Sequence, residues 1–209
     1  RFQDAAIHAT IIQQNMPKDD NSAVFHIFDR LNSGGTPLQA QEMRAAIYHG
    51  EFQDLLEELN ENEDWRAIFG APNKRGKDQE LILRFLALHF NSTTYSEPMK
   101  RFLNEFMEEN RNASRATSKR FKSVFEDTCA KAVDCLGERP FRPVRTLNVA
   151  VFDSCMLALA NNSDPKAKAI QRGYEKLLES DDYKSATSKS TASEANVKTR
   201  IRLAKEFLG

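Results

Sequence analysis

The stretch Asp78–Phe90, "DQELILRFLALHF", decides the fold class because apolar residues surround it on almost every side. A helix with so little polar face is usually buried at the centre of its domain. Arg84 is the one charge in its interior, and a buried charge needs a partner. The stretch therefore predicts a central helix with a paired arginine inside it. Its apolar positions are Leu81, Ile82, Leu83, Phe85, Leu86 and Leu88.

Helical periodicity continues on both sides of this stretch. Before it, apolar residues recur at helical spacing within 24–31, 38–47 and 52–59, followed by a hydrophobic knob at Trp65, Ile68 and Phe69. After it, helices are expected over 99–110, 117–136, 148–161, 165–180 and 195–208. The Ser/Thr/Lys-rich segment 180–193, "SDDYKSATSKSTAS", is expected to be a loop. The pattern predicts an all-α, irregular multi-helix bundle of about eight to ten helices.

The N-terminal stretch Ala5–Gln13, "AAIHATIIQ", fits both a strand and a helix because it alternates weakly and is rich in β-branched residues. If it is a strand, no nearby segment is a convincing partner, which places its sheet in a portion upstream. The chain also opens on Arg1 instead of Met, so we expect a fragment or a processed piece. We therefore divide the chain into an N-terminal remnant, residues 1–20, and a helical domain, residues 21–209.

Charge and hydropathy limit the classes of partner. Thirty Lys and Arg balance thirty Asp and Glu, so the whole chain has no field that attracts nucleic acid or an anionic membrane. Contact with a polyanion then requires a local basic cluster. No apolar run reaches the roughly 18 residues of a membrane span, and the start has no signal-peptide pattern. These features predict a cytoplasmic protein without a membrane partner.

The usual enzyme signatures are absent from the sequence. The four histidines form no H-x-x-x-H or H-E-x-x-H pattern, and there is no G-x-S-x-G, Walker A or G-x-G-x-x-G motif. Cys129, Cys135 and Cys155 are odd in number and form no C-x-x-C pair, which favours buried free thiols. We assign no catalytic residue and no metal ligand.

The turn Asn32–Thr36, "NSGGT", has two interpretations. In the first it is only capping chemistry: Gly34 or Gly35 closes one helix, and Thr36 caps the next, with Pro37 and Gln39 completing the signal and Gly50 ending that helix. In the second, backbone N–H groups of the Gly-containing turn form an anion-binding nest beside a helix N-terminus. Asn32 would then offer its carboxamide to a nucleotide, Arg44 would supply charge, and Glu42 would orient it or a neighbouring basic group.

Two basic clusters are candidate contacts for nucleic acid phosphates. "RATSKRFK" contains Arg115, Lys119, Arg120 and Lys122, and "RPFRPVR" contains Arg139, Arg142 and Arg145. The alternative is a solvated helix face and a rigid connector, which the neutral total charge favours.

The segment "VFHIFDRLNSGGTPLQAQEMRAAIYHGEF" resembles part of the GmrSD-type N-terminal domain family, which comprises ParB-like domains of modification-dependent restriction and phage-defence proteins. The resemblance lies in Phe28 and Asn32, the following Gly-Gly-Thr, and the Glu-x-Arg pattern at Glu42 and Arg44. "RGKDQELILRFLALHF" is similar to the next helix of that family, and "RTLNVAVFDSCMLAL" and "VKTRIRLA" are weaker matches.

This resemblance implies a ParB-like fold with an Asp-Gly-Gln-Gln-Arg motif, linked to nucleotide binding or hydrolysis, followed by a helical portion. The chain lacks that motif and the His-Asn-His nuclease domain of many relatives. We therefore expect the helical part of a DNA-targeting defence protein, not catalytic alone but part of an NTP-dependent endonuclease. NTP with Mg is its implied cofactor, and DNA and a nuclease domain or subunit are its implied partners. The alternative is a non-enzymatic helical module that docks a nuclease or partner subunit.

Overall fold

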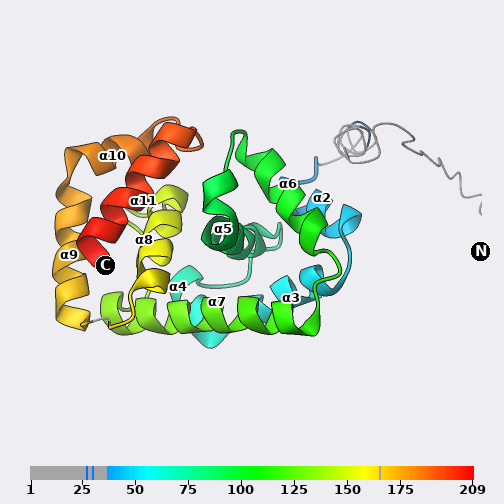
Figure 1. Ribbon diagram of the computed structural model, residues 1–209, viewed down its shortest axis with the longest axis horizontal. Helices are drawn as coiled ribbons and strands as arrows, with labels where there is room; N and C mark the ends of the chain where they lie inside the picture. The colour runs from blue at the N-terminus through cyan, green and yellow to red at the C-terminus, as the bar shows by residue number, and fades with distance from the viewer. Residues whose placement is uncertain (1–26, 28–29, 31–36, 165) are drawn as a thin grey trace, which may run out of the picture. The chain divides into compact units, whose positions relative to one another are not determined.

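The computed structural model describes Ile27, Arg30, residues 37–164 and residues 166–209. Within these residues ten α-helices, α2 to α11, and one 3₁₀ helix, η3, are joined by loops, and no strand is present (Figure 1). The expected all-α architecture is confirmed. The contacts divide the chain into two units, Arg1–Gln39 and Ala40–Gly209. The ambiguous Ala5–Gln13 stretch and the N-terminal remnant lie outside the described residues, so the boundary after residue 20 stays a prediction.

The helices of the second unit follow one another with short connections. The first six elements are α2 (Ala40–Ile47), α3 (Glu51–Asn60), α4 (Glu63–Phe69), α5 (Lys77–Asn91), η3 (Ser92–Thr94) and α6 (Met99–Asn110). The remaining five are α7 (Arg115–Leu136), α8 (Val149–Asn161), α9 (Ala167–Glu179), α10 (Asp181–Ser188) and α11 (Glu194–Leu208).

Helix α5 lies at the centre of this unit, as its apolar sequence predicts. It packs against α2, α3, α6, α7 and α8, and Figure 1 shows it end-on between them. Its predicted apolar positions are all buried. Arg84 has the partner that the sequence required: its guanidinium binds both carboxylate oxygens of Asp153 on α8, at 3.1 and 2.5 Å. The core therefore forms around α5 and continues into α8.

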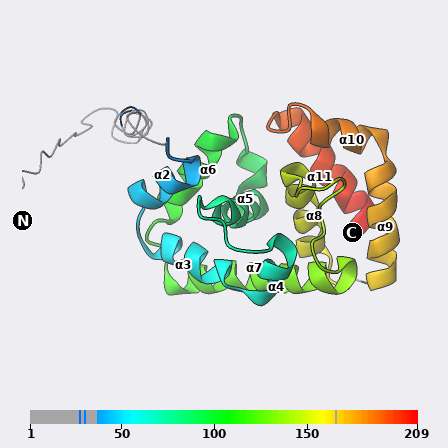
Figure 2. The same cartoon turned by 180° about the vertical axis from the view of Figure 1, so that it is seen from behind.

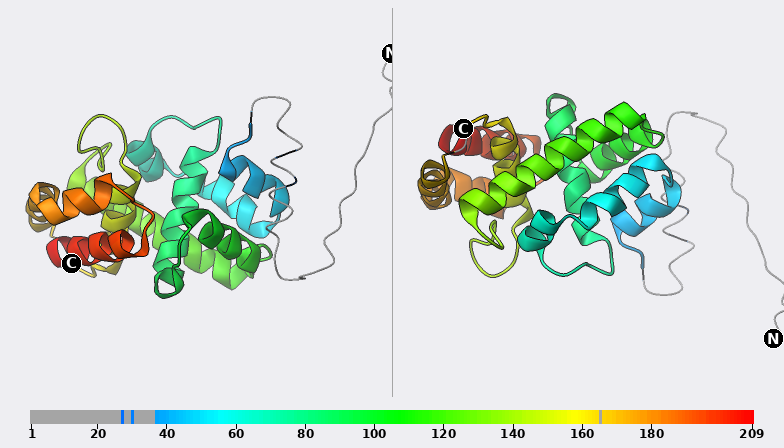
Figure 3. Two further views of the ribbon diagram at one scale, coloured as in Figure 1. Left: turned by 90° about the horizontal axis from the view of Figure 1, so that it is seen from above. Right: turned by 90° about the horizontal axis from the view of Figure 1, so that it is seen from below.

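Helix α7 packs against two groups of helices, one formed by α3, α4 and α5 and the other by α8 and α9. It meets the first group along one part of its length and the second along another. Figures 2 and 3 show it running beneath both groups. Its 22 residues span about 33 Å at the usual rise of an α-helix. The two ends of α7 consequently lie on different parts of the unit.

The C-terminal helices surround α8, which is buried along most of its length. Helix α11 packs against both α8 and α9, while α10 lies against α8, α9 and α11. At Gly173 the α9 backbone approaches α11 so closely that an added Cβ would lie 2.0 Å from the carbonyl oxygen of Phe207. Glycine is therefore required by the packing of α9 on α11.

Two local expectations were wrong. The segment expected to be a loop contains α10, whose start is capped by Ser180, which accepts a hydrogen bond from the Tyr183 amide. Tyr183, Ala186 and Thr187 bury one face of this short helix, and that burial outweighs its polar composition.

The start and end of α2 also differ from the prediction. Pro37–Gln39 are not helical and α2 begins at Ala40, so the expected capping position at Pro37 is wrong. The helix ends at Ile47, and Gly50 instead precedes α3 as its N-cap. A Cβ on Gly50 would lie 2.7 Å from the carbonyl oxygen of Arg111. Close approach of the loop after α6, more than helix termination, explains this glycine.

Candidate functional site

Arg44, a predicted phosphate ligand, is buried inside the helical unit. Its side chain is 2% exposed. The guanidinium donates to Asn104 at 3.0 Å, to Gln41 at 2.9 Å and to Glu80 at 3.0 Å. Burial lowers the pKa of Arg44, and the opposing charge of Glu80 raises it, with a net shift downward. In this position Arg44 fixes α2 to α5 and α6.

Glu42 lies on the same helix and pairs with Arg75, in the loop before α5. Both Nε and Nη2 of Arg75 lie 2.8 Å from the Glu42 carboxylate. The expected partnership of Glu42 with a neighbouring basic group is therefore present, and that group is Arg75. The other predicted ligands of this site, Asn32, Gly34 and Gly35, lie outside the described residues.

The first turns of α7 carry Arg115, Lys119 and Arg120, which we call the α7 cations. All three side chains are exposed. Within the described part of the chain, Arg115 and Lys119 have no hydrogen-bonded or ion-paired side-chain partner. The Arg120 guanidinium lies over the Phe90 ring, 4.7 Å from its centroid. The adjacent Lys122 pairs with Glu58 and Glu126 and is thus engaged within the protein.

The position of Arg115, the first residue of α7, works against helix stability. The N-terminus of a helix carries partial positive charge, and cations there are unfavourable by a few tenths of a kcal/mol or more. The first turn of α7 has no acidic residue to offset Arg115. Ser114 satisfies one of the free N–H groups of this helix end, that of Thr117. Arg115 therefore does not help α7 to form.

The second predicted cluster lies in residues 139–145, which we call the arginine loop. Arg142 is turned back into the protein: its Nη1 donates to the carbonyl of Ile68 and its Nη2 to that of Phe69, both at 2.8 Å. Free carbonyl groups at a helix end need such donors. Arg142 therefore caps the C-terminus of α4, and burial, followed by the charge of Arg139, lowers its pKa.

The backbone of the arginine loop is held at several points. The Arg139 amide donates to the Ala67 carbonyl at 3.0 Å, and the Phe141 amide donates to the Tyr174 hydroxyl at 3.1 Å. Arg139 and Phe141 adopt φ values of 53° and 62°. Such left-handed conformations cost about 1–2 kcal/mol for residues with a Cβ and persist only where surrounding contacts determine them. The loop is therefore a fixed feature of the surface.

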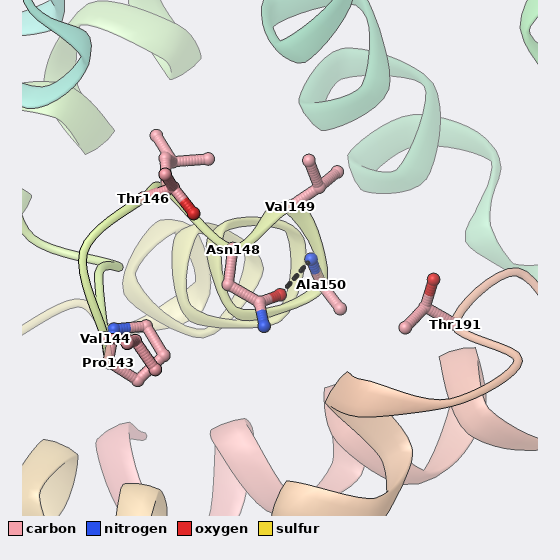
Figure 4. Close-up of a pocket in the computed structure, with 8 residues that line it drawn as sticks. Pro143, Val144, Thr146, Asn148, Val149, Ala150 and Thr191 are labelled. Carbon is pink, nitrogen blue, oxygen red and sulfur yellow. Dashed lines mark hydrogen bonds between the residues drawn. The ribbon is translucent and has the colours of Figure 1, made fainter.

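Four residues of the arginine loop are exposed: Arg139, Pro143, Val144 and Arg145. Arg139 and Arg145 are exposed and have no ion-paired partner among the described residues. Val144 is 87% exposed, an unusual state for a large aliphatic residue. Pro143 and Val144 line a surface pocket of about 300 Å³ at the start of α8, with Thr191 on its far side (Figure 4). No pattern in the sequence distinguishes Val144 from other apolar residues.

The six residues predicted to contact DNA consequently fall into two separate groups. One of the six, Arg142, has a structural role. The α7 cations lie at the beginning of α7, whereas the arginine loop follows its end. Because α7 spans about 33 Å, the two sets do not converge on one phosphate. Arg142 is the member engaged in helix capping.

A cluster of nucleophilic side chains lies in the core, beneath α10. The Ser154 and Tyr183 hydroxyl groups are 2.7 Å apart, and the Cys155 thiol is 3.5 Å from the Tyr183 hydroxyl. All three residues are buried. Burial raises the pKa of Cys155 to about 12, so the thiol is protonated at neutral pH. A protonated and inaccessible thiol does not act as a nucleophile.

Cys129 and Cys135 are likewise buried, and the three cysteines are free thiols, as the sequence predicted. In the described part of the chain, no three His, Cys, Asp or Glu side chains gather closely enough to hold a metal ion. None of the described helices combines the length and apolar composition needed to cross a membrane.

Comparison with protein-family models, with curated proteins and with solved structures gave no match to this chain.

Proposed function

We propose that this chain is the helical part of a DNA-targeting restriction or anti-phage defence protein, and that its exposed cations contact DNA phosphates. The observation that carries the proposal is that some of its cationic side chains are bonded inside the protein, whereas others are exposed and have no ion pair. Arg44, Arg84, Arg142 and Arg200 are hydrogen-bonded inside the protein. Arg115, Lys119, Arg139 and Arg145 are exposed, and none has an ion pair to another described residue.

Free surface cations support DNA binding in a protein whose total charge is zero. Arginines that stabilise the fold are hydrogen-bonded to carboxylates and carbonyl groups inside the protein. They contribute little to the electrostatic field outside it. Other exposed cations without an ion pair among the described residues, such as Lys168, Arg172 and Lys176, lie on α9, and those at the start of α7 and in the arginine loop are the ones within the two basic sequence clusters. Neutralising phosphates with such side chains releases counterions, which makes binding strongly dependent on salt.

Charge reversal of the α7 cations tests this function. We expect Arg115→Glu combined with Lys119→Glu to weaken binding to duplex DNA and to reduce the slope of log K against log salt by about one for each lost phosphate contact. The matched control is Arg101→Glu with Lys198→Glu, because both native side chains have intrahelical acidic partners. Affinity is measured by fluorescence anisotropy over a salt series. Equal slopes for both double variants would contradict a phosphate role for the α7 cations.

The proposed nucleotide site involves the turn at Asn32, Gly34 and Gly35, with a ParB-like half supplied upstream. Arg44 and Glu42 then act as positioning residues, since Arg44 fixes α2 and Glu42 binds Arg75. In this arrangement NTP with Mg is bound by the turn and the upstream half together. The nuclease domain or subunit responds to this binding of NTP.

The test of the nucleotide site is Asn32→Ala in a chain that includes an upstream Asp-Gly-Gln-Gln-Arg motif. We expect loss of most NTP hydrolysis and of restriction, because the carboxamide that orients the nucleotide is removed. Gln171→Ala, at an exposed position on α9 far from the turn in the sequence, is the control. A folded Asn32→Ala protein with full hydrolysis would remove Asn32 from the site.

A second candidate function is a non-enzymatic docking module for a nuclease or partner subunit. Val144 favours it, because this exposed side chain lines a surface pocket that a partner's side chain would fill. The two functions differ in one measurement. A docking module binds its protein partner and shows no salt-dependent affinity for DNA.

A further inference from the structure

We propose that the arginine loop inserts its tip, Pro143 and Val144, into a groove of duplex DNA while Arg139 and Arg145 contact the flanking phosphates. This inference rests on the proposed DNA-contacting function and adds the form of DNA recognised and the apolar residue that enters it.

The arginine loop is held in one conformation by contacts at both of its ends. Phe141 is fully buried, and its ring packs against Phe152 at 5.7 Å. Its carbonyl accepts the Asn148 amide at 2.9 Å, next to the start of α8. Arg142 ties the same loop to α4. A tip held from both sides loses little conformational entropy on binding, which favours affinity.

The exposed side chains of the loop have the chemistry of a DNA contact. The arginine loop contains three arginines and no acidic residue, and two of those arginines are directed to solvent. Their charge complements a polyanion. Val144 lies between them in the sequence, and its side chain is 87% exposed. Apolar side chains flanked by cations enter DNA grooves, where they contact sugars and base edges while the cations contact phosphates.

The side chains of the loop suit duplex DNA better than single-stranded DNA. Proteins that bind single strands stack the bases on exposed aromatic side chains. The one aromatic residue of the arginine loop, Phe141, is buried beneath it. An aliphatic tip without a stacking surface is suited to a groove, whose walls are the backbones of a paired duplex.

The experiment separates the apolar contact from the ionic ones. Val144→Ser in the 209-residue chain is expected to weaken binding to a mixed-sequence duplex about tenfold, the effect of losing one buried aliphatic contact, with the salt slope unchanged. Arg139→Gln with Arg145→Gln is expected to reduce that slope by about two. Arg202→Gln, from an exposed intrahelical pair with Glu206, is the matched control and is expected to change neither quantity.

Arg142→Gln supplies a structural contrast, because this arginine caps α4 instead of facing solvent. It is expected to lower the free energy of unfolding and to leave the salt slope of the folded protein unchanged. All variants are compared after their unfolding curves are recorded. Val144→Ser lies on the surface, where substitutions usually change stability by less than about 0.5 kcal/mol.

Two results would overturn the inference while leaving the proposed function intact. One is a native affinity for duplex in Val144→Ser, when the wild type binds in a salt-dependent way. The other is tighter binding of the matching single strand than of the duplex. If the wild-type chain shows no salt-dependent DNA binding and Val144→Ser abolishes capture of a protein partner, both proposals fail in favour of docking.

Discussion

Replacing Asp153 with alanine is expected to lower the free energy of unfolding by about 3–5 kcal/mol, the usual cost of removing one partner from a buried ion pair. Asp153 is fully buried and binds two arginines, Arg84 of α5 and Arg200 of α11. Arg200 is fully buried as well. Alanine would leave two guanidinium groups in the core without a counter-charge. Denaturation in urea, followed by circular dichroism, measures the change.

The pKa of Arg84 also shows the effect of Asp153. Burial by itself lowers the pKa of Arg84, but the charge and hydrogen bonds of Asp153 raise it, and the net shift is upward. Asp153 therefore stabilises the charged form of a side chain that is 12% exposed. The three residues join α5, α8 and α11 by charge across the centre of the unit.

A triple variant tests the reason for the loss. Replacing Arg84 and Arg200 with Met and Asp153 with Leu removes all three charges together, and buried ionic groups replaced by apolar residues of similar volume often cost little. We expect this variant to be more stable than Asp153→Ala, although it loses more hydrogen bonds. If Asp153→Ala lowered the free energy of unfolding by less than about 1 kcal/mol, as is typical of exposed pairs, the three residues Arg84, Asp153 and Arg200 would not have the stabilising role expected of them.

For Arg84, the sequence predicts that a partner is needed, but it does not predict which residue the partner is. The apolar surroundings of Arg84 predicted that it needs a partner, because burial of a charge is costly wherever it occurs. The identity of the partner depends on how α5 meets α8, and the two residues are 69 positions apart. Periodicity describes one helix at a time and carries no information on such a distant contact.

Errors in the prediction have local physical causes. Helix α10 was missed because its composition is polar, although Ser180 and the spacing of Tyr183, Ala186 and Thr187 are signals for a capped, one-sided helix. Among the candidate site residues, charge alone did not separate Arg142 from Arg139 and Arg145. Their difference arises from the carbonyl groups at the end of α4, which become neighbours of Arg142 only in the folded chain.

Replacing Trp65 with alanine is also expected to cost about 3–5 kcal/mol, the range for removing a large aromatic residue from a core. Trp65 is fully buried, and its ring lies 5.7 Å from that of Phe125 on α7 and 5.6 Å from that of Phe152 on α8. Its indole Nε1 donates to Asn60 at 3.0 Å. Alanine would leave a cavity where α4, α7 and α8 meet. Since Trp65 is the single tryptophan, circular dichroism is used in place of fluorescence.

Trp65→Phe is the matched control. It keeps an aromatic ring in the cavity and removes the indole donor, while Asn60 still accepts from Arg66 at 2.8 Å. We expect a smaller loss, about 1–2 kcal/mol. Similar losses for the alanine and phenylalanine variants would mean that the indole hydrogen bond, and not ring packing, is the main contribution.

The same substitution connects the core to the proposed DNA-binding loop. Helix α4 contains Trp65 and also presents the Ala67 carbonyl that binds the Arg139 amide. If Trp65 holds α4 in place, its loss will loosen that hydrogen bond before the whole unit unfolds. We therefore expect faster hydrogen exchange at the Arg139 amide in Trp65→Ala than in Trp65→Phe, beyond the difference in global stability. Equal protection after correction for global unfolding would show that the arginine loop is held independently of the Trp65 core.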